Sequence, residues 1–201
     1  MSLWLMPDPL VLASKSRSRH ALLEAAGIPV EVVPADIDER AVEAEAVIAG
    51  PGEVAGLLAR EKALAVAARM PGRLVVGADQ TLALGTQRFS KPSDQASARR
   101  QLLALRGHVH ELYSGFALAR DTAVLGADVT IARLTMRAFS DQSLDAYLAA
   151  AGATVLHSIG AYQLERIGVH LFECVEGDHF TILGLPLLPL LACLRKNGFV
   201  A

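Results

Sequence analysis

A short segment at residues 14–19 combines side chains that bind anions. It reads SKSRSR, with Ser14, Ser16 and Arg19 between an apolar run typical of a strand and a pattern typical of a helix. Free backbone N–H groups at such a helix start, two hydroxyl groups and an arginine together can hold a phosphate. Serines also serve simply as helix caps, so both interpretations stay open. Neither GxxxxGK[ST] nor GxGxxG occurs, which argues against a Walker-type NTPase or a dinucleotide binder.

Acidic residues form a second candidate group. The sequence DIDE occupies residues 36–39, ending at Glu39, and Asp79 comes directly after the apolar run 74–76. Paired carboxylates can hold Mg²⁺ while it also contacts substrate phosphates, and one acid can orient or deprotonate a water molecule. Acidic loops are usually only solvated, which is the alternative for residues 36–39. An acid that follows a buried strand has a desolvation cost, so Asp79 is expected to be paired, metal-bound or functional.

The few lysines form a third group. Arginine dominates the positive residues, and the lysines are only Lys15, Lys62, Lys91 and Lys196. Lys62 lies on the expected helix before Asp79, and Lys91 follows Asp79 before Pro92. A lysine kept in such a chain indicates that a compact ammonium group is needed instead of a guanidinium fork. Lys15 and Lys196 carry no such indication.

The elements that must position these residues follow from hydrophobic periodicity and turn residues. Helices alternate with strands, and a long hairpin intervenes, so we predict an α/β or α+β fold with a mixed sheet. Residues 34–40 are expected to form a loop. Asp79 is expected to follow the end of a strand. We expect strands at 10–13, 30–33, 74–76 and 81–84, a hairpin over 109–136 and a strand near 169–174. A first helix is expected after the 14–19 segment and ends at Gly27, and further helices are expected at 53–70, 93–105, 140–150 and 186–198.

Length and composition limit the class of protein. A chain of 201 residues without repeats or a Ser/Gly linker fits a single domain, residues 1–201. A net charge of -2 excludes a protein that binds nucleic acid mainly by bulk charge, and the 5% aromatic content argues against an RNA-binding module. The 52% apolar content excludes intrinsic disorder and predicts a core built mostly from Ala and Leu. Any polyanion must therefore be bound locally.

Cysteine usage and the apolar segments indicate the compartment. Cys174 and Cys193 are too few for a disulfide framework and lack metal-ligand spacing, so a cytoplasmic protein is expected. The N-terminal residues have no basic segment before the apolar ones, and therefore do not read as a signal peptide. The apolar run 182–194 is well short of the ~20 residues of a membrane span, and predicts a core helix.

The whole set of motifs, in order, resembles the Maf family. The segments are LASKSRSRHALLEAAG, DIDE, LAREKA, VVGADQT, KPSDQASARRQLLALRGHVHE, GAYQLE and LGLPL, which together span nearly the whole chain. The resemblance implies an elongated mixed α/β fold of the Maf and inosine triphosphatase kind, with two lobes and a central cleft. It also implies a house-cleaning enzyme of nucleotide metabolism that uses a divalent cation, Mg²⁺ or Mn²⁺. That enzyme would cleave a nucleoside triphosphate to the monophosphate and pyrophosphate.

The resemblance also implies roles for single residues. Asp79 matches the family's proton acceptor, and Glu39 matches the acid that joins it at the metal. Ser14 and Arg19 match residues that hold the phosphates, and so do Lys62 and Lys91 at the catalytic centre. Ser16 belongs to the same anion-binding segment. Arg19, Lys62, Lys91 and a divalent ion carry more positive charge than the two carboxylates of Glu39 and Asp79 neutralise. The remaining positive charge would face a triphosphate, although the protein as a whole is not basic.

Three positions distinguish branches of the family, and here they are Ser18, Gln80 and Glu165. The dTTP and UTP branch usually has Arg, Thr and Gln there, whereas the branch that prefers 7-methyl-GTP usually has Trp, Gln and Glu. This chain matches the second branch at two of the three positions. A carboxylate at Glu165 can accept hydrogen bonds from N1–H and N2–H₂ of guanine, whereas thymine offers one donor there. Ser18 in place of Trp removes a cation–π partner for a methylated base, so guanine is predicted more firmly than its methylation.

Alternatives remain open from the sequence. A regulator of cell division could bind a nucleotide in the same cleft without hydrolysing it, although the set Glu39, Lys62, Asp79 and Lys91 is intact here. The partner is expected to be a free nucleotide, with no nucleic acid and no membrane, and a homodimer is left open. His108 and His110 alternate on one expected strand without a third metal ligand, so core or surface roles are expected for them.

Overall fold

The computed structural model describes residues 3–45 and 50–201, which group into two compact units. Unit 1 comprises Met1–Gln80, Tyr113–Thr130 and Asp178–Ala201, and unit 2 comprises Thr81–Leu112 and Ile131–Gly177. Several strands therefore contribute residues to both units. Most of the predicted site lies in unit 1.

A seven-stranded mixed sheet is the framework of the described residues. Its order is β2-β1-β3-β5-β6-β7, with β4 paired to β3. β1 pairs in parallel with β2 and β3, whereas β3–β4 and β6–β7 are antiparallel. The predicted fold class, a mixed α/β sheet flanked by helices, is confirmed. The strands are β1 Leu10–Leu12, β2 Val30–Val32, β3 Leu74–Leu84, β4 Gln87–Phe89, β5 Val109–Arg120, β6 Ala123–Met136 and β7 Phe172–Glu176.

The helices begin at residues suited to cap them. Asp94 and Ser140 accept hydrogen bonds from backbone N–H groups three residues on, and Pro186 precedes the last helix, as the sequence predicts. The helices are α1 Arg17–Ala25, α2 Glu39–Glu45, α3 Pro51–Ala67, α4 Gln95–Leu105, α5 Asp141–Ala151, α6 His179–Ile182 and α7 Leu187–Lys196, with short 3-10 helices η1 Gly152–His157, η2 Ile159–Ala161 and η3 Ile167–Leu171.

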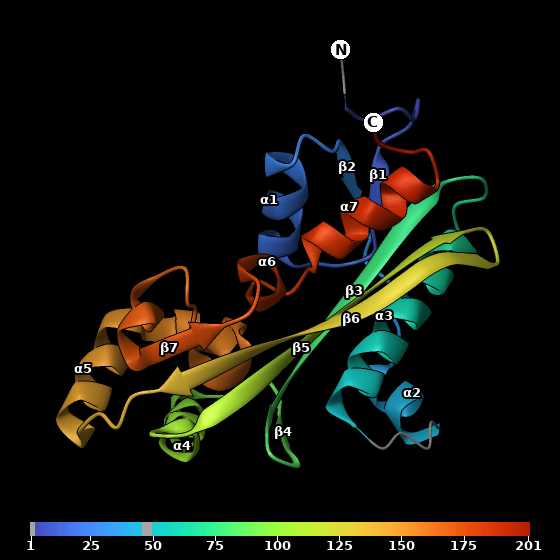
Figure 1. Cartoon of the computed structure of the whole chain (residues 1–201). Helices are drawn as coiled ribbons and strands as arrows, with labels where there is room; N and C mark the ends of the chain where they lie inside the picture. Colours follow the sequence, from blue (N-terminus) through green and yellow to red (C-terminus); the bar gives the residue numbers. More distant parts are fainter. Residues whose placement is uncertain (1–2, 46–49) are drawn as a thin grey trace. The chain divides into compact units, whose positions relative to one another are not determined.

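In unit 1 the sheet separates two apolar clusters. Because side chains alternate along a strand, Val76 and Ala78 face one cluster, which contains residues of α1 and α7. Val75 faces the other cluster, which contains Ala63 and Val66 of α3. Figure 1 shows α1 and α7 on one side of β3 and α3 on the other. The two faces of β3 therefore have different neighbours, which matters for the residues that follow Ala78.

Helix α3 lies unusually close to the sheet. A Cβ atom added at Gly77 would lie 2.2 Å from the carbonyl oxygen of Ala59 and 2.5 Å from the backbone nitrogen of Ala63. A Cβ at Gly115 of β5 would lie 2.8 Å from the carbonyl oxygen of Ala55. Glycine in the sheet and alanine on the helix thus let the two backbones approach closely, and this explains why residue 77, two positions before Asp79, is a glycine.

Gly77→Ala should lower the free energy of unfolding by about 1–3 kcal/mol, because α3 must move away from β3 to admit the methyl group. Urea unfolding followed by circular dichroism measures the effect. Gly50→Ser is the control, since a Cβ at Gly50 meets no atom within 4 Å and serine is a favoured N-cap. Equal stability of Gly77→Ala and the wild type would contradict the close approach of α3.

In unit 2, His110 is a fully buried polar residue. Its Nε2 is 2.8 Å from Oη of Tyr162, and its ring centroid is 5.6 Å from that of Tyr162 and 5.9 Å from that of Phe172. Burial lowers the pKa of His110 from 6.5 to about 4. The expected core role is confirmed for His110, whereas His108 is exposed.

The buried imidazole predicts a loss of stability in mild acid. An unfolded histidine binds a proton as the pH falls through about 6.5, whereas the folded one stays neutral until about pH 4. The neutral, buried His110 therefore contributes fully to the free energy of unfolding above pH 6.5. Between pH 6.5 and 4 this contribution is lost, which lowers the free energy of unfolding by up to about 3 kcal/mol. Urea unfolding at pH 7 and at pH 4.5 measures it. The double variant His110→Phe/Tyr162→Phe should lose less stability over this interval; an unchanged loss would assign it to other groups.

Three expected elements are wrong in their bounds. The strand expected at 169–174 begins only at Phe172, because residues 167–171 form η3, where Gly168 packs on the backbone of Gln163. Residues 81–84 are no separate return strand, since β3 continues through them, and the return strand is β4. The expected loop at 34–40 ends earlier, as Glu39 begins α2.

Among residues 3–45 and 50–201, no helix combines the length and the apolar character needed to cross a membrane. The apolar run 182–194 begins at the last residue of α6 and continues through a turn into most of α7, whose Leu187, Leu190 and Leu194 are buried, as expected for a core helix.

Candidate active site

The candidate site lies where β1 ends and its neighbour β3 continues. The backbone nitrogen of Ala13 donates to the carbonyl oxygen of Val76 (2.8 Å), and β1 ends at Leu12. Beyond this point the carbonyl oxygen of Ala78 accepts a hydrogen bond from Nη1 of Arg19 instead (2.7 Å). Arg19 thus occupies the edge of β3 at the carboxyl end of a parallel strand, which is where open α/β sheets bind their ligands.

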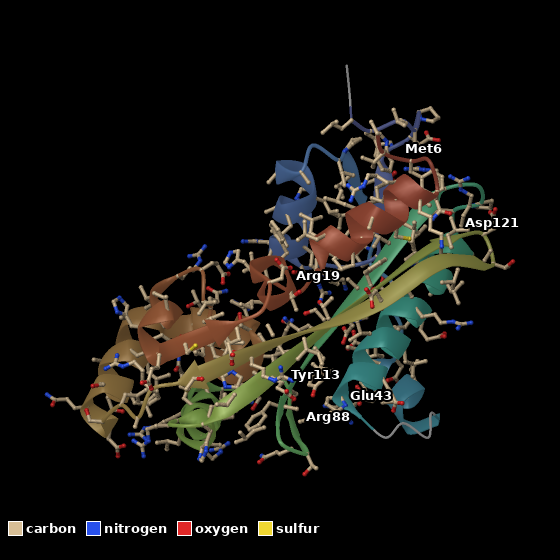
Figure 2. All side chains as sticks on the ribbon, viewed as in Figure 1. Met6, Arg19, Glu43, Arg88, Tyr113 and Asp121 are labelled. Carbon is tan, nitrogen blue, oxygen red and sulfur yellow. The ribbon has the colours of Figure 1, made fainter. Side chains whose placement is uncertain are left out.

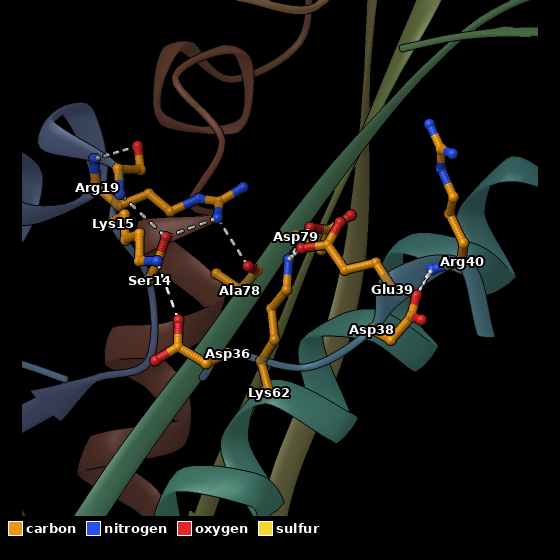
Figure 3. Close-up of polar contacts among 11 residues, drawn as sticks. Ser14, Lys15, Arg19, Asp36, Asp38, Glu39, Arg40, Lys62, Ala78 and Asp79 are labelled. Atoms are coloured by element: carbon orange, nitrogen blue, oxygen red, sulfur yellow. Dashed lines mark hydrogen bonds and ion pairs between the residues drawn. The ribbon is translucent and has the colours of Figure 1, made fainter. Parts of the chain in front are cut away.

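Arg19 connects three segments of unit 1. Besides Ala78, its Nη1 donates to Oγ of Ser14 (3.0 Å), and its Nε donates to the carbonyl oxygen of Gly184 (2.7 Å). Figure 2 labels Arg19, which extends from α1, and Figure 3 shows its contacts with Ser14 and Ala78. Burial lowers the pKa of Arg19, while the carboxylates of Asp79 and Glu39 oppose that shift. A guanidinium group stays charged under these conditions, so a buried positive charge is fixed at this edge.

The serines of the 14–19 segment have distinct places. Oγ of Ser14 accepts hydrogen bonds from the backbone nitrogen of Ser16 (3.2 Å) and from Arg19. Ser16 is the N-cap of α1, and its Oγ accepts from the backbone nitrogen of Arg19 (3.4 Å). Ser18 lies in the first turn and is half-buried. The capping interpretation is confirmed for Ser16, and phosphate binding by this segment stays a prediction.

Lys62 joins the two predicted acids. Its Nζ is 2.5 Å from Oδ1 of Asp79 and 2.7 Å from Oε1 of Glu39 (Figure 3). The side chains of Lys62 and Asp79 are 11% and 12% exposed, whereas that of Glu39 is 50% exposed. Burial raises the pKa of Asp79 above its ordinary value, against the opposing effect of Lys62 and Arg19. The structure therefore brings together Arg19, Glu39, Lys62 and Asp79 in unit 1.

Two local features of the sequence position these acids differently from the expectation. Asp79 lies inside β3 instead of after a strand end, and the ion pair with Lys62 offsets its desolvation there. Glu39 begins α2 because Oδ1 of Asp38 accepts from the backbone nitrogens of Arg40 and Ala41, both at 3.1 Å. The motif DIDE thus contains a helix cap, Asp38, followed by Glu39 as the first residue of α2, and Asp38 was the signal for a helix start.

Glu39 and Asp79 could hold a divalent cation. Within the described ranges, no group of three or more His, Cys, Asp or Glu residues is arranged to hold a metal ion. The two carboxylates nevertheless converge on a single cationic group, Nζ of Lys62. Mg²⁺ is commonly bound by one or two carboxylates together with substrate phosphates and water. The residues present fit such a shared site, and do not form a site that the protein alone would complete.

Two predicted site residues belong to unit 2. Lys91 is exposed in the segment between β4 and α4, and Glu165 is exposed in the turn before η3. Their contacts with a substrate stay predictions from the family resemblance.

Sequence reasoning missed the residues that surround Gln80. Nε2 of Gln80 donates to Oγ of Ser114 and to the carbonyl oxygens of Thr181 and Ile182, each at 3.0 Å. Gly184, whose φ of 91° suits glycine, faces both Gln80 and Arg19. Gly184 lies in the motif LGLPL, but the sequence around Ser114 offers no comparable signal, because a serine in an apolar strand is common.

A solved structure shares this fold. The HAM1 protein from Coxiella burnetii superimposes with a TM-score of 0.51 at 15% sequence identity, covering 94% of this chain and 98% of that one. The likeness supports the mixed α/β fold.

Sequence relatives cover the whole chain. A protein of Rhodopseudomonas palustris (strain HaA2), named nucleoside triphosphate pyrophosphatase, is 56% identical over 201 residues, 100% of both chains. A protein of Mesorhizobium japonicum, named 7-methyl-GTP pyrophosphatase, is 52% identical over 197 residues, covering 97% of this chain and 99% of that one. The family model described as Maf-like protein matches residues 9–197. The chain that carries Arg19, Lys62 and Asp79 at one strand edge therefore belongs to the Maf family.

Proposed function

We propose that this Maf-family hydrolase is a nucleoside triphosphate pyrophosphatase, which cleaves its substrate to a nucleoside monophosphate and pyrophosphate. The observation that supports it best is the buried Asp79, paired with Lys62 and lying beside Arg19 at the open edge of β3. Relatives more than 50% identical over the full chain bear the name of this activity. The chain is thus an enzyme acting on acid anhydrides.

Asp79 is suited to accept a proton from water. Its raised pKa makes the carboxylate a better base than an ordinary surface aspartate, and Nζ of Lys62 keeps its orientation. As the water oxygen forms a bond to the α-phosphorus, its proton passes to Asp79 and the bond to the β-phosphate oxygen breaks. Negative charge then grows on the leaving pyrophosphate, where the fixed charges of Arg19 and Lys62 stabilise it.

We further propose that the enzyme uses Mg²⁺ or Mn²⁺, held by Glu39 and Asp79 together with the substrate. When bound, such an ion neutralises phosphate charge and positions the reacting oxygens. The single ammonium group between the two carboxylates supports a cation-binding role for this pair. Lys62, Ser14 and Ser16 are proposed to contact phosphates, as is Lys91 of unit 2.

For the base, we propose a guanine-type nucleotide. Glu165 supports this on chemical grounds, because a carboxylate accepts two hydrogen bonds from guanine N1–H and N2–H₂. One relative bears the name 7-methyl-GTP pyrophosphatase. Ser18 offers no aromatic face to a methylated, positively charged base, so GTP itself is proposed to be a substrate alongside 7-methyl-GTP.

The purified protein should release pyrophosphate from a panel of GTP, 7-methyl-GTP, dTTP, UTP and CTP with Mg²⁺ or Mn²⁺. Orthophosphate as the primary product would refute the proposed reaction. Saturable binding without any hydrolysis would favour the alternative, a nucleotide-binding regulator of cell division.

Glu165→Gln should reduce the preference for guanine about tenfold, and an unchanged preference would remove Glu165 from base selection.

We also propose that the enzyme acts on free nucleotides in the cytoplasm, and not on nucleic acid or at a membrane. The net charge of -2 supports the exclusion of nucleic acid, because the protein as a whole is not basic.

A further inference from the structure

The amide of Gln80 is held on the face of β3 opposite Asp79. Successive residues of a strand point to opposite faces, so the side chain of Gln80 lies on the same side as that of Ala78. Its Nε2 donates to three acceptors: Oγ of Ser114, the Thr181 carbonyl and the Ile182 carbonyl. An amide nitrogen carries only two hydrogens, so these acceptors engage both of them.

Ser114 and the carbonyl groups of Thr181 and Ile182 together decide which end of the amide faces inward. It is fully buried on β5, and its Oγ donates its only hydrogen to the carbonyl oxygen of Thr181 (2.7 Å). The hydroxyl can therefore only accept from Gln80. A flipped amide would place its oxygen against two carbonyl oxygens and this hydroxyl lone pair, with no donor among them. The amide oxygen must point away from Ser114.

That oxygen points toward the candidate site. A Cβ at Gly184 would lie 3.5 Å from Oε1 of Gln80 and 3.4 Å from both Nε and Nη2 of Arg19. The missing side chain at Gly184 leaves this space open between the amide oxygen and the guanidinium group. The side chain of Gln80 thus offers a hydrogen-bond acceptor, and no donor, next to the charge that we propose to face the triphosphate.

A second layer holds the acceptors in place. Oγ1 of Thr181 is 2.7 Å from Oγ1 of Thr130, and the backbone nitrogen of Thr181 donates to Oδ2 of Asp178 (3.1 Å), the N-cap of α6. Thr181 is itself fully buried. The carbonyl that receives hydrogen bonds from both Ser114 and Gln80 is therefore fixed by contacts that do not involve Gln80.

We infer that Ser114 is a positioning residue for base selection, which together with the carbonyl groups of Thr181 and Ile182 holds Gln80 as a pure hydrogen-bond acceptor and so favours nucleobases that present an N–H donor. The inference rests on the proposed function, because it names what selects the substrate at the same site. Guanine presents both N1–H and N2–H₂, whereas thymine presents only N3–H, so an acceptor at Gln80 in addition to Glu165 favours guanine over thymine.

The experiment measures selectivity in a double-mutant cycle. The ratio of kcat/KM for GTP to that for dTTP is determined for the wild type, Ser114→Ala, Gln80→Met and the double variant. Ser114→Ala should lower the ratio about three- to tenfold, mainly through a higher KM for GTP. In the Gln80→Met background the same substitution should change the ratio less than twofold, since Ser114 acts only through the amide.

Ser140→Ala is the matched control. It removes the hydroxyl that caps α5 in unit 2, where it accepts from the backbone nitrogen of Ser143 (3.2 Å), and should lower Tm while leaving the ratio unchanged. A Ser114→Ala variant with a lower Tm and the wild-type ratio would overturn the inference, as would equal effects in both backgrounds. If the wild type binds nucleotides but does not hydrolyse them, the proposed function fails. The Kd ratio of GTP to dTTP in the same cycle then still tests Ser114.

Discussion

Asp79→Asn should reduce kcat for pyrophosphate release by about 10²–10⁴-fold, because the amide cannot accept the proton of the attacking water. The fold should survive, since Lys62 retains Glu39 as a partner at 2.7 Å. Measured without a divalent cation, which Asp79 is proposed to help hold, the Kd for the nucleotide should stay within about threefold of the wild type, because a negative charge beside a polyphosphate has been removed and not added. Initial rates at saturating substrate and calorimetric binding measure the two quantities separately.

Asp145→Asn is the control for this substitution. Asp145 forms an exposed ion pair with Arg99 (3.1 Å) in unit 2, and its loss should leave kcat within twofold. The pH dependence gives a second test: because the pKa of Asp79 is raised, the wild-type rate should begin to fall with acidification at a higher pH than an ordinary aspartate would give. Full turnover by Asp79→Asn would exclude Asp79 as the base.

Lys62→Met should lower the free energy of unfolding by about 3–5 kcal/mol at pH 8, because it leaves Asp79 buried without its nearest counterion. The loss should be smaller at pH 5.5, since the carboxyl group, whose pKa is raised by burial, can then be neutralised by a proton. Turnover should be lost as well. Lys62→Arg should recover part of the stability but less than a tenth of the activity, because a planar guanidinium group does not fit a position where one Nζ lies 2.5 Å and 2.7 Å from two carboxylate oxygens.

Lys15→Met provides the matched comparison. Lys15 pairs with Asp36 at 3.0 Å, but their side chains are 75% and 61% exposed. Lys15→Met should lower the free energy of unfolding by less than about 1 kcal/mol at either pH. Urea unfolding of both variants at the two pH values measures the difference. Equal losses for the two lysines would mean that burial of the Lys62 pair contributes nothing.

Much of the fold was predictable from local signals. The helices capped by Asp94 and Ser140 begin within two residues of the expected starts at 93 and 140, and β5 and β6 occupy the hairpin expected over 109–136. The errors occur where tertiary contacts decide. β3 continues past Asp79 because Lys62, distant in sequence, neutralises the acid, and residues 167–171 form η3 against the backbone of Gln163.

The candidate site was predictable in its residue types but not in its connections. Asp79 and Lys62 were identified by the cost of burying a charge and by the scarcity of lysine, and the structure pairs them. That Arg19 binds the backbone of Ala78 and Gly184 could not be inferred, because carbonyl groups leave no trace in a sequence. The same holds for Ser114, because a serine in an apolar strand gives no sign that its hydroxyl contacts Gln80 and Thr181.

The alternation of residues along β3 has a consequence for how such an enzyme can change. Gly77 and Asp79 face α3, where backbone-to-backbone packing leaves no room for variation, whereas Ala78 and Gln80 face α6 and α7. Substitutions on β5, α6 or the turn at Gly184 can therefore reshape the surroundings of Gln80 without displacing the pair Asp79 and Lys62. A lineage, or a protein engineer, could exchange one nucleotide for another by altering one side of a single strand while the hydrolytic machinery on its other side is inherited intact.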